Sequence, residues 1–325
     1  MLHLQSACAH AAIITGPGRF KLTPVRRADP GVGEVRVRII GCGVCASNLV
    51  PWAGPEWMRF PTEPGAMGHE AWGVVDEIGA EVQDLAVGDC VATLFQRSYA
   101  AFDTGPVSQV VRLPESLAGQ PFPGEPLGCA MNICRRAGIE AGQHVAIIGI
   151  GFLGAILTRL ASDTGAHVIA ISRRPTSLQM ARRMGAAECI PMEDHWAIIE
   201  QVKAMTGGEF CHRVIEAVGT QWPLDLAAEL TRVRGRLVIA GYHQDGPRKV
   251  NMQLWNWRGL DVVNAHERDP AEYLRGMREA VEAVASGKLD PSPLYTHRFP
   301  LSALGDALDM TRDRPDGFMK ALVEP

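Results

Sequence analysis

The stretch from residue 144 to residue 174 limits the fold of this chain more than any other segment. It begins with an apolar, β-branched run at residues 145–148, which is typical of a strand buried on both faces of a parallel sheet. An apolar helical run follows at residues 155–161, and a second apolar strand at residues 166–171. Strand, helix and strand in this order predict a parallel βαβ unit.

Three glycines join the first strand to the helix, at the spacing G-x-G-x-x-G: Gly149, Gly151 and Gly154. The first allows a tight turn, the second lets backbone approach a pyrophosphate, and the third lets the helix pack on the strand. With Phe152 and Leu153, they place backbone N–H groups and the positive end of the helix dipole where phosphates would bind. We therefore predict a dinucleotide site. The alternative, a glycine-rich turn without a ligand, leaves the helix and second strand unexplained.

The end of the second strand indicates which dinucleotide binds. An NAD site places Asp or Glu here for the ribose hydroxyls, but this chain has Ser172, Arg173 and Arg174. No carboxylate is present to repel a 2′-phosphate, and two guanidinium groups can hold one. The sequence therefore favours NADP(H) over NAD(H). The alternative is that both arginines are solvated on a loop.

Length and composition exclude several classes of protein. The 325 residues suffice for two domains, and 46% hydrophobic with 21% charged residues predicts a soluble, globular protein. A net charge of −4 gives no reason to expect nucleic acid as a partner. No apolar run approaches a membrane span, and we find no signal peptide. The eight cysteines are scattered, which favours a reducing cytoplasm over a disulfide framework.

The pattern of elements changes along the chain. Residues 1–120 are typical of short strands separated by Gly and Pro turns, for example at 34–40 and 72–78, and predict a mostly β domain. From about residue 130, strands alternate with helices, which predicts a doubly wound parallel sheet. We expect domains at 1–130, completed by 269–325, and at 131–268. Further strands are expected at 213–216, 236–240 and 260–263, and further helices at 176–184, 224–230 and 271–286.

Possible metal ligands are spread through the β domain. Cys45 lies in a glycine-rich turn after a strand, His69 and Glu70 open another strand, and Glu125 and Cys129 precede the α/β region. Cys, His and Glu together form a ligand set suited to zinc, and a catalytic zinc keeps one position open. Each residue taken alone is more often structural.

These motifs, in this order, resemble the medium-chain dehydrogenase/reductase family in its zinc-dependent alcohol dehydrogenase branch, and the resemblance covers almost the whole chain. It implies an α/β protein, with a GroES-like mostly β catalytic domain and a Rossmann dinucleotide-binding domain. The matching motifs are residues 43–48, residues 68–73 with Gly79, residues 87–89, residues 125–127, and the turn of Gly149, Gly151 and Gly154.

The resemblance implies roles for the candidate ligands. Cys45 and His69 resemble zinc ligands, and Glu70 resembles a carboxylate that binds the metal or stands beside it. Glu125 matches the carboxylate ligand of the polyol and secondary-alcohol branches, whereas Cys129 matches the cysteine ligand of the common alcohol dehydrogenases. The choice between these two stays open.

Proton transfer is the second role that the resemblance implies. Ser47 resembles the hydroxyl that passes the alcohol proton towards water, but the histidine that continues this relay in several relatives is Val50 here. Asn48 replaces the usual Asp and is expected to accept a hydrogen bond from His69. The standard proton route is therefore in doubt.

Cysteine placement bears on the number of metals. Many relatives bind a structural zinc through four closely spaced cysteines, but no cysteine lies between Cys90 and Glu125. We predict one catalytic zinc and no structural zinc, with Cys42 and Cys90 as core residues.

Weaker cofactor contacts follow from the same resemblance. Gly219 and Gly241 match positions that line the nicotinamide half, and Lys320 matches a basic residue that can reach the pyrophosphate. The alternative for Lys320 is a solvated surface lysine. Relatives commonly pair through sheet edges, which implies a homodimer or homotetramer.

The sequence thus predicts an oxidoreductase that transfers hydride between NADP(H) and an alcohol/ketone pair of the secondary-alcohol, polyol, cyclitol or sugar-like class. Trp52, Trp57 and Trp72 are expected either to wall the substrate pocket or to pack in the core, and His266 to reach the site or a subunit contact. Two alternatives are a zinc-free NADPH-dependent reductase of activated double bonds and a non-catalytic NADPH-binding protein. Zinc-free reductases of that kind lack the Cys45, His69 and Glu70 set, which counts against the first alternative, and the second would need no metal.

Overall fold

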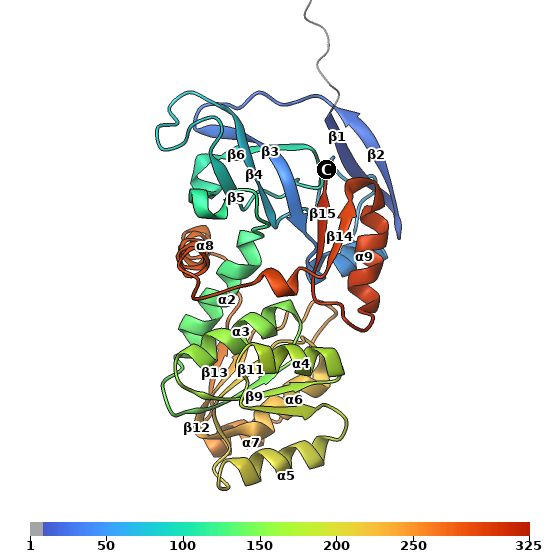
Figure 1. Ribbon diagram of the computed structural model, residues 1–325. Coiled ribbons are helices and arrows are strands. Elements are labelled where there is room, and N and C mark those ends of the chain that lie inside the picture. The colour runs from blue at the N-terminus through green and yellow to red at the C-terminus, as the bar shows by residue number, and fades with distance from the viewer. Residues whose placement is uncertain (1–8) are drawn as a thin grey trace, which may run out of the picture. The chain divides into compact units, whose positions relative to one another are not determined.

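The computed structural model describes residues 9–325. The chain divides into two compact units, and each is described by itself (Figure 1). Unit 1 extends to Pro126 and resumes at Ala280, and unit 2 is Leu127–Glu279. The sequence placed these divisions near residues 130 and 269.

Unit 1 is built around a largely antiparallel sheet. Its strand order is β14-β15-β3-β4-β5-β7, with β6 beside β3, and a separate hairpin pairs β1 with β2. The strands expected at 34–40 and 72–78 are present as β3 and β4. The bounds are β1 Ala9–Gly16, β2 Arg19–Val25, β3 Glu34–Gly43, β4 Ala71–Ile78, β5 Cys90–Thr93, β6 Phe102–Pro106, β7 Val110–Arg112, β14 His297–Pro300 and β15 Ala321–Glu324.

The core of unit 1 follows from the alternation of apolar residues along β3. Val35, Val37 and Ile39 are buried on one face of this strand, as the two-residue period of a strand requires. Leu304 and Leu308 of helix α9 (Leu304–Asp313) join the same core. The last segment of the chain therefore completes this domain.

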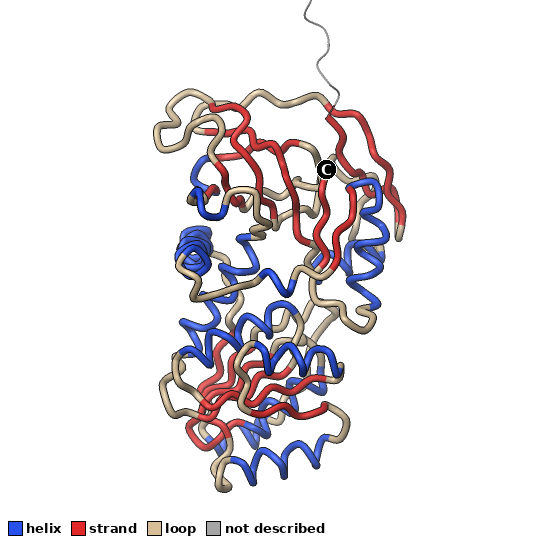
Figure 2. The backbone as a smooth tube through the Cα atoms, viewed as in Figure 1, coloured by secondary structure: helices blue, strands red, loops and turns tan. Residues whose placement is uncertain are grey.

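Unit 2 is a six-stranded parallel sheet of order β10-β9-β8-β11-β12-β13 (Figure 2). Because the chain order reverses between β8 and β11, the sheet has a topological switch point there, and ligands bind outside the carboxyl ends of strands at such points. The bounds are β8 His144–Ile148, β9 His167–Ser172, β10 Glu188–Pro191, β11 Cys211–Glu216, β12 Thr231–Ile239 and β13 Asp261–Asn264.

Helices flank this sheet in two groups, with α3 packed beside α4 and α5 beside α6. The βαβ unit predicted from the glycine spacing is therefore present. The structure adds strand β10 and helix α5, which the sequence did not predict, and α2 before β8. The bounds are α2 Gly124–Ala137, α3 Phe152–Asp163, α4 Pro175–Arg183, α5 His195–Met205, α6 Gln221–Leu230, α7 Met252–Arg258 and α8 Pro270–Ala285, with α1 Leu49–Ala53 in unit 1.

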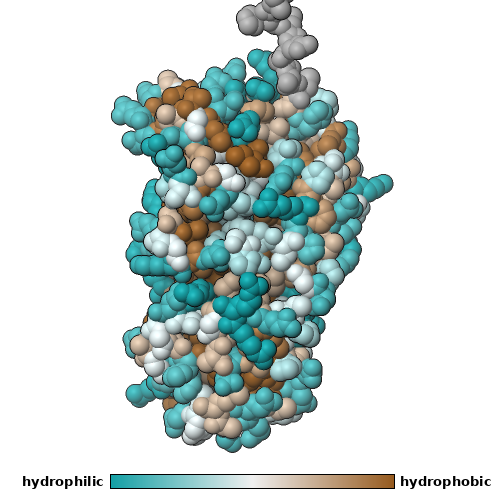
Figure 3. All heavy atoms as spheres, viewed as in Figure 1, coloured by the Kyte–Doolittle hydropathy of each residue, from teal (hydrophilic) through white to brown (hydrophobic). Residues whose placement is uncertain are grey.

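The centre of the unit 2 sheet is fully apolar. Residues 145–148 of β8 have no exposed surface, as expected for a strand covered by helices on both faces. Hydrophilic side chains cover much of the face in Figure 3, and apolar patches are scattered among them. Within residues 9–325, no helix has the length and apolar character needed to cross a bilayer.

Candidate metal and cofactor sites

Three strand ends in unit 1 bring the predicted metal ligands together. Antiparallel pairing of β3 with β4 sets Cys42 opposite Ala71, so the turn after β3, with Cys45, lies beside His69 and Glu70. The Gly43 N–H donates to the Glu70 carbonyl over 3.0 Å. Pairing of β15 with β3 brings the start of β15 to the same place.

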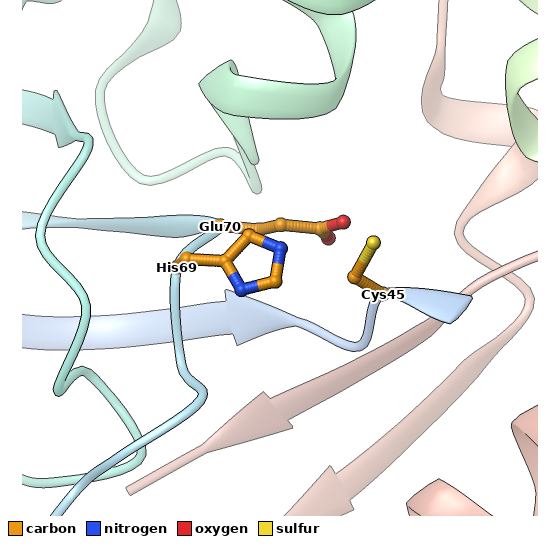
Figure 4. A group of neighbouring side chains, drawn as sticks. All are labelled: Cys45, His69 and Glu70. Atoms are coloured by element: carbon orange, nitrogen blue, oxygen red, sulfur yellow. The ribbon is translucent and has the colours of Figure 1, made fainter. Parts of the chain in front are cut away.

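The three side chains point toward one another (Figure 4). One ligand atom each of Cys45, His69 and Glu70 lies within 4.8 Å of the other two. Within the described part of the chain, this is the only group of three or more such ligands that close together. We refer to these three residues as the metal cluster.

A backbone carbonyl fixes the imidazole. The Nδ1 atom of His69 lies 2.9 Å from the Met67 carbonyl, which leaves Nε2 for the cluster when Nδ1 carries the proton. Asn48 Nδ2 donates to the same carbonyl over 3.1 Å. Met67 has a φ of 75°, a left-handed conformation that is uncommon outside glycine, and this turn aims its carbonyl at both donors.

The expectation that Asn48 accepts a hydrogen bond from His69 is wrong. Asn48 is buried, and its Oδ1 accepts from the Tyr99 hydroxyl at 2.9 Å and from the Cys45 N–H at 3.3 Å. His69 and Asn48 instead both donate to the Met67 carbonyl. Asn48 therefore supports the imidazole through a shared acceptor.

Glu70 has a buried cationic partner in Lys320. The Lys320 Nζ lies 2.7 Å from Oε1 and 2.5 Å from Oε2 of Glu70, and the two residues are 5% and 0% exposed. A solvated surface lysine, the alternative given for Lys320, is therefore wrong. Contact of Lys320 with a pyrophosphate stays a prediction. A Cβ on Gly43 would lie 1.9 Å from the Glu70 Oε2, so glycine makes room for this pair.

The electrostatics of the metal cluster favour a cation. Burial lowers the pKa of His69, but Cys45, Glu125 and Glu70 outweigh burial and raise that pKa to about 10. Burial also opposes the charge of Lys320, yet Glu70, Cys45 and Glu125 raise its pKa above the ordinary value. These acidic groups would stabilise a divalent ion in the same way, and a thiol, an imidazole and a carboxylate suit zinc. The residues present therefore fit this metal.

The third protein ligand is carried by helix α2 in either version of the prediction. Glu125 and Cys129 are four residues apart, so they lie one turn apart on the same face of that helix. Glu125 acts electrostatically on His69. Which of the two residues completes the metal site stays a prediction.

Other residues of the predicted site are placed as follows. Ser47 lies in the short helix that begins after Cys45, and its N–H donates to the Cys45 Sγ over 3.5 Å. Cys42 is a buried core residue of β3, as expected, and burial raises the pKa of its thiol. Cys90 is in strand β5 but is only partly buried.

Two of the three tryptophans pack in the interior. Trp52 and Trp72 are each 3% exposed, and the Trp52 indole N–H donates to Asp309 over 2.9 Å. Trp57 is 63% exposed. Of the two interpretations, core packing holds for Trp52 and Trp72.

The glycine turn of unit 2 has the form that its spacing predicts. Gly149 has a φ of 95°, and a Cβ on Gly154 would lie 2.0 Å from the Gly149 carbonyl oxygen, so the helix packs directly on the turn. A Cβ on Gly151 would meet no protein atom within 4 Å. No side chain caps helix α3, which begins at Phe152 and Leu153. An open space before an uncapped helix start fits a dinucleotide phosphate.

The predicted cofactor-selecting residues lie beside this turn. The Gly149 N–H donates to Ile171 over 2.8 Å, which sets the turn next to Ser172, the last residue of β9. Ser172 is buried, Arg173 is exposed, and Arg174 is half-buried at the start of α4. The structure thus keeps two cationic side chains and no carboxylate at this strand end.

Gly219 and Gly241 meet at the carboxyl ends of β11 and β12. Gly219 has a φ of 85°, and a Cβ on it would lie 2.8 Å from the backbone carbonyl oxygen of Tyr242. A Cβ on Gly241 would lie 2.3 Å from the Gly219 nitrogen. Both positions therefore require glycine because backbone packs on backbone.

Several supporting residues were not found from the sequence. Tyr99 and the Met67 carbonyl hold the metal cluster through Asn48 and His69, and in unit 2 the buried carboxylate of Glu216 binds the turn that contains Gly219. Met67 lies between Gly65 and Gly68, and this glycine-rich segment was the available sequence signal of a turn at that place. No sequence signal pairs Tyr99 with Asn48.

Two family models match this chain. A zinc-binding dehydrogenase model matches residues 153–283, and an alcohol dehydrogenase GroES-like domain model matches residues 31–120. Together they cover more than half of the chain. The GroES-like match lies within the predicted β domain, and the other match covers most of the predicted Rossmann domain and extends 15 residues beyond it.

Individual relatives match over nearly the full length. A 2-dehydro-3-deoxy-L-galactonate 5-dehydrogenase of Pseudoalteromonas atlantica is 26% identical, over 97% of this chain and 98% of the relative. A sorbitol dehydrogenase of Gallus gallus is 26% identical, over 93% of each chain. A crystal structure of a putative zinc-binding dehydrogenase from Sinorhizobium meliloti, bound to NADP, has the same fold, with a TM-score of 0.83 and 24% sequence identity. The match covers 98% of this chain and 100% of that chain.

Proposed function

This chain belongs to the medium-chain dehydrogenase/reductase family, in its zinc-dependent alcohol dehydrogenase-like branch, and from that premise we propose that it interconverts a secondary alcohol and a ketone with NADP(H). The substrate class is a polyol, cyclitol or sugar-like alcohol. The observation that carries the proposal is the metal cluster, in which Cys45, His69 and Glu70 bring their ligand atoms within 4.8 Å.

The relatives support the substrate class. Among them are dehydrogenases named for sorbitol and for a deoxy sugar acid, both hydroxyl-rich compounds. A protein with the same fold is described as bound to NADP. These are properties of those proteins, and we extend them to this chain as part of the proposal.

In the proposed mechanism, Cys45 and His69 would hold zinc, together with Glu70 and with Glu125 or Cys129. Zinc supplies Lewis acidity that lowers the pKa of an alcohol, and NADP(H) supplies or accepts the hydride. The Met67 carbonyl orients His69, and Lys320 neutralises Glu70. The Ser47 hydroxyl takes the alcohol proton in this proposal, and Val50 requires that the proton leave by another route than the histidine relay.

Unit 2 holds the cofactor in the same proposal. The backbone of Gly149, Gly151 and Gly154 would face the pyrophosphate, and Arg173 and Arg174 would bind the 2′-phosphate. A cytoplasmic location, a single catalytic zinc without a structural one, and a homodimer or homotetramer remain predictions from the sequence.

Elemental analysis with a substrate screen tests the proposal. We expect about one zinc per chain, and oxidation or reduction in a panel of polyols, cyclitols and ketones, followed by the absorbance of reduced nicotinamide with NADPH and with NADH. Metal-free protein that still reduces activated double bonds would favour the zinc-free reductase. Nucleotide binding without metal or turnover would favour the non-catalytic protein.

A further inference from the structure

A buried carboxylate at the end of β11 lies outside the predicted site. Glu216 has no exposed surface, and its Oε1 accepts the N–H groups of Val218 and Gly219, each over 2.7 Å. Its backbone carbonyl accepts the N–H groups of Ala240 and Gly241 over 2.8 Å. Glu216 therefore joins the loop after β11 to the loop after β12.

A histidine and an arginine extend this contact outward. The second carboxylate oxygen of Glu216 lies 3.1 Å from His243 Nε2, and His243 Nδ1 lies 2.9 Å from Arg248 Nε. Because a guanidinium only donates, Nδ1 is the acceptor and Nε2 carries the proton toward Glu216. Arg248 also donates from Nη2 to the Gly219 carbonyl over 2.8 Å, and it pairs with Asp245.

The Gly219 turn is thus held from both ends. Glu216 binds its N–H, and Arg248 binds its carbonyl. Val218 next to it is packed so closely on the dinucleotide turn that a Cβ on Gly149 would lie 2.4 Å from its Cγ2. The Gly219 loop therefore lies directly beside the dinucleotide turn.

The strand order indicates which part of a dinucleotide meets these loops. The ribose-selecting residues 172–174 follow β9, and the phosphate turn follows β8. A dinucleotide crosses the carboxyl edge at the switch point, so the half beyond the pyrophosphate extends away from β9. The neighbours on that side are β11 and β12, whose ends carry Gly219 and Gly241.

We propose that Glu216, His243 and Arg248 are positioning residues that set the two loops against which the nicotinamide half of the cofactor binds. This inference rests on the proposed function of the chain. It assigns a role to a partly buried hydrogen-bond network that would otherwise only stabilise the fold.

The test compares a whole cofactor with a fragment that lacks nicotinamide. His243→Leu removes both hydrogen bonds at similar size, whereas His243→Gln keeps one donor and one acceptor. His195→Leu is the matched control, because His195 is a half-buried histidine of unit 2 that accepts an N–H from Trp222 over 3.0 Å. Binding of NADPH and of adenosine 2′,5′-bisphosphate is measured by titration calorimetry.

We expect His243→Leu to weaken NADPH binding about tenfold, the scale of one lost buried hydrogen-bond pair, and to leave the fragment unchanged. His243→Gln should recover most of the affinity, and the control should alter neither ligand. Amide hydrogen exchange should rise at residues 217–220 in His243→Leu only. Should His243→Leu fold poorly, Arg248→Met, at the outer end of the network, should give the same selective loss.

Two other outcomes separate the hypotheses. Equal weakening of both ligands, or of neither, in a folded variant would overturn the positioning role while leaving the proposed function intact. A wild-type chain that binds neither NADPH nor NADH would overturn both. If the wild type prefers NADH, the comparison is made between NADH and ADP-ribose.

Discussion

The metal cluster is formed by largely buried polar side chains from three strand ends in unit 1. The carboxyl edge of the unit 2 sheet is instead formed mainly by closely packed glycine backbone. Glu70 and Lys320 are almost fully buried, and a carbonyl fixes His69. At the other site, Gly151 leaves an open space in front of a helix start.

The difference follows from where the charge comes from. Charged and polar groups buried at the metal cluster need partners within the protein. Lys320 pairs with Glu70, and Tyr99 donates a hydrogen bond to Asn48 beside the cluster. Phosphate charge would arrive with the cofactor, so that site needs mainly N–H groups and room. Removing a side-chain group should therefore impair metal binding or stability at the metal cluster. Adding a methyl group should impair stability or cofactor binding at the glycine turn.

The largest effect should come from a metal ligand. Cys45→Ala removes the thiolate, and we expect loss of bound zinc and a fall in kcat of roughly a thousandfold or more, since the Lewis acid is lost. Zinc per chain and turnover are both measured. Cys42→Ala, three residues earlier in the core, is the matched control and should keep its zinc; a loss of zinc there would contradict the ligand assignment.

Removing the partner of a buried charge should come next. Lys320→Met leaves Glu70 buried without its cation, which is expected to lower the free energy of unfolding by about 3–5 kcal/mol. Urea unfolding of the metal-free protein measures this. The double variant Lys320→Met with Glu70→Gln should recover much of the loss. Equal instability of single and double variants would show that the pair itself is not the cause.

The glycine turn offers the opposite experiment. Gly154→Ala sets a methyl group against the Gly149 carbonyl and should destabilise the protein by about 1–3 kcal/mol. Gly151→Ala meets only open space in an extended backbone, so stability should stay within about 0.5 kcal/mol, while NADPH affinity falls. Thermal unfolding and NADPH titration separate the two. Unchanged NADPH affinity in Gly151→Ala would place the pyrophosphate elsewhere.

A smaller effect is expected from the arginines that would select the cofactor. Arg173→Asp with Arg174→Ala should weaken NADPH binding about tenfold, the scale of a charge-assisted contact at an exposed site, and should leave NADH binding nearly unchanged or improved. The ratio of the two dissociation constants is the measurement. A ratio equal to that of the wild type would show that these arginines are only solvated.

The smallest effect tests the opposite edge of the unit 2 sheet, where His144, His167 and His212 lie together. Burial and His167 lower the pKa of His144, and burial and Arg232 lower that of His212. As the pH falls, these histidines become protonated in the unfolded chain before they do in the folded chain. The free energy of unfolding therefore falls as the pH drops through about 6.5. Solvent screening keeps the loss below about 1 kcal/mol. His212→Gln should flatten the slope of unfolding free energy against pH; an identical slope would contradict this.

Local patterns in the sequence were sufficient for the framework of unit 2. The apolar run before Gly149 and the spacing to Gly154 predicted the strand, turn and helix because each depends on neighbouring residues. Strand β10 was missed because its four residues form no recognisable period. The cofactor preference and the third metal ligand remain predictions.

Contacts between distant residues account for what the sequence did not show. The expected contact of Asn48 with His69 came from the family resemblance, in which Asp usually occupies this position, but in the structure the Met67 carbonyl is the shared acceptor of both residues. The pairing of Lys320 with Glu70 depends on the register of β15 against β3. No periodicity in the chain encodes such a register.

That pairing also sets an order of events during synthesis. Lys320 and Glu70 are 250 residues apart, and all of unit 2 is translated between them. A nascent chain that has only reached unit 2 therefore exposes Glu70 with neither its lysine nor strand β15 beside it. The buried ion pair can therefore close only after the final strand has left the exit tunnel.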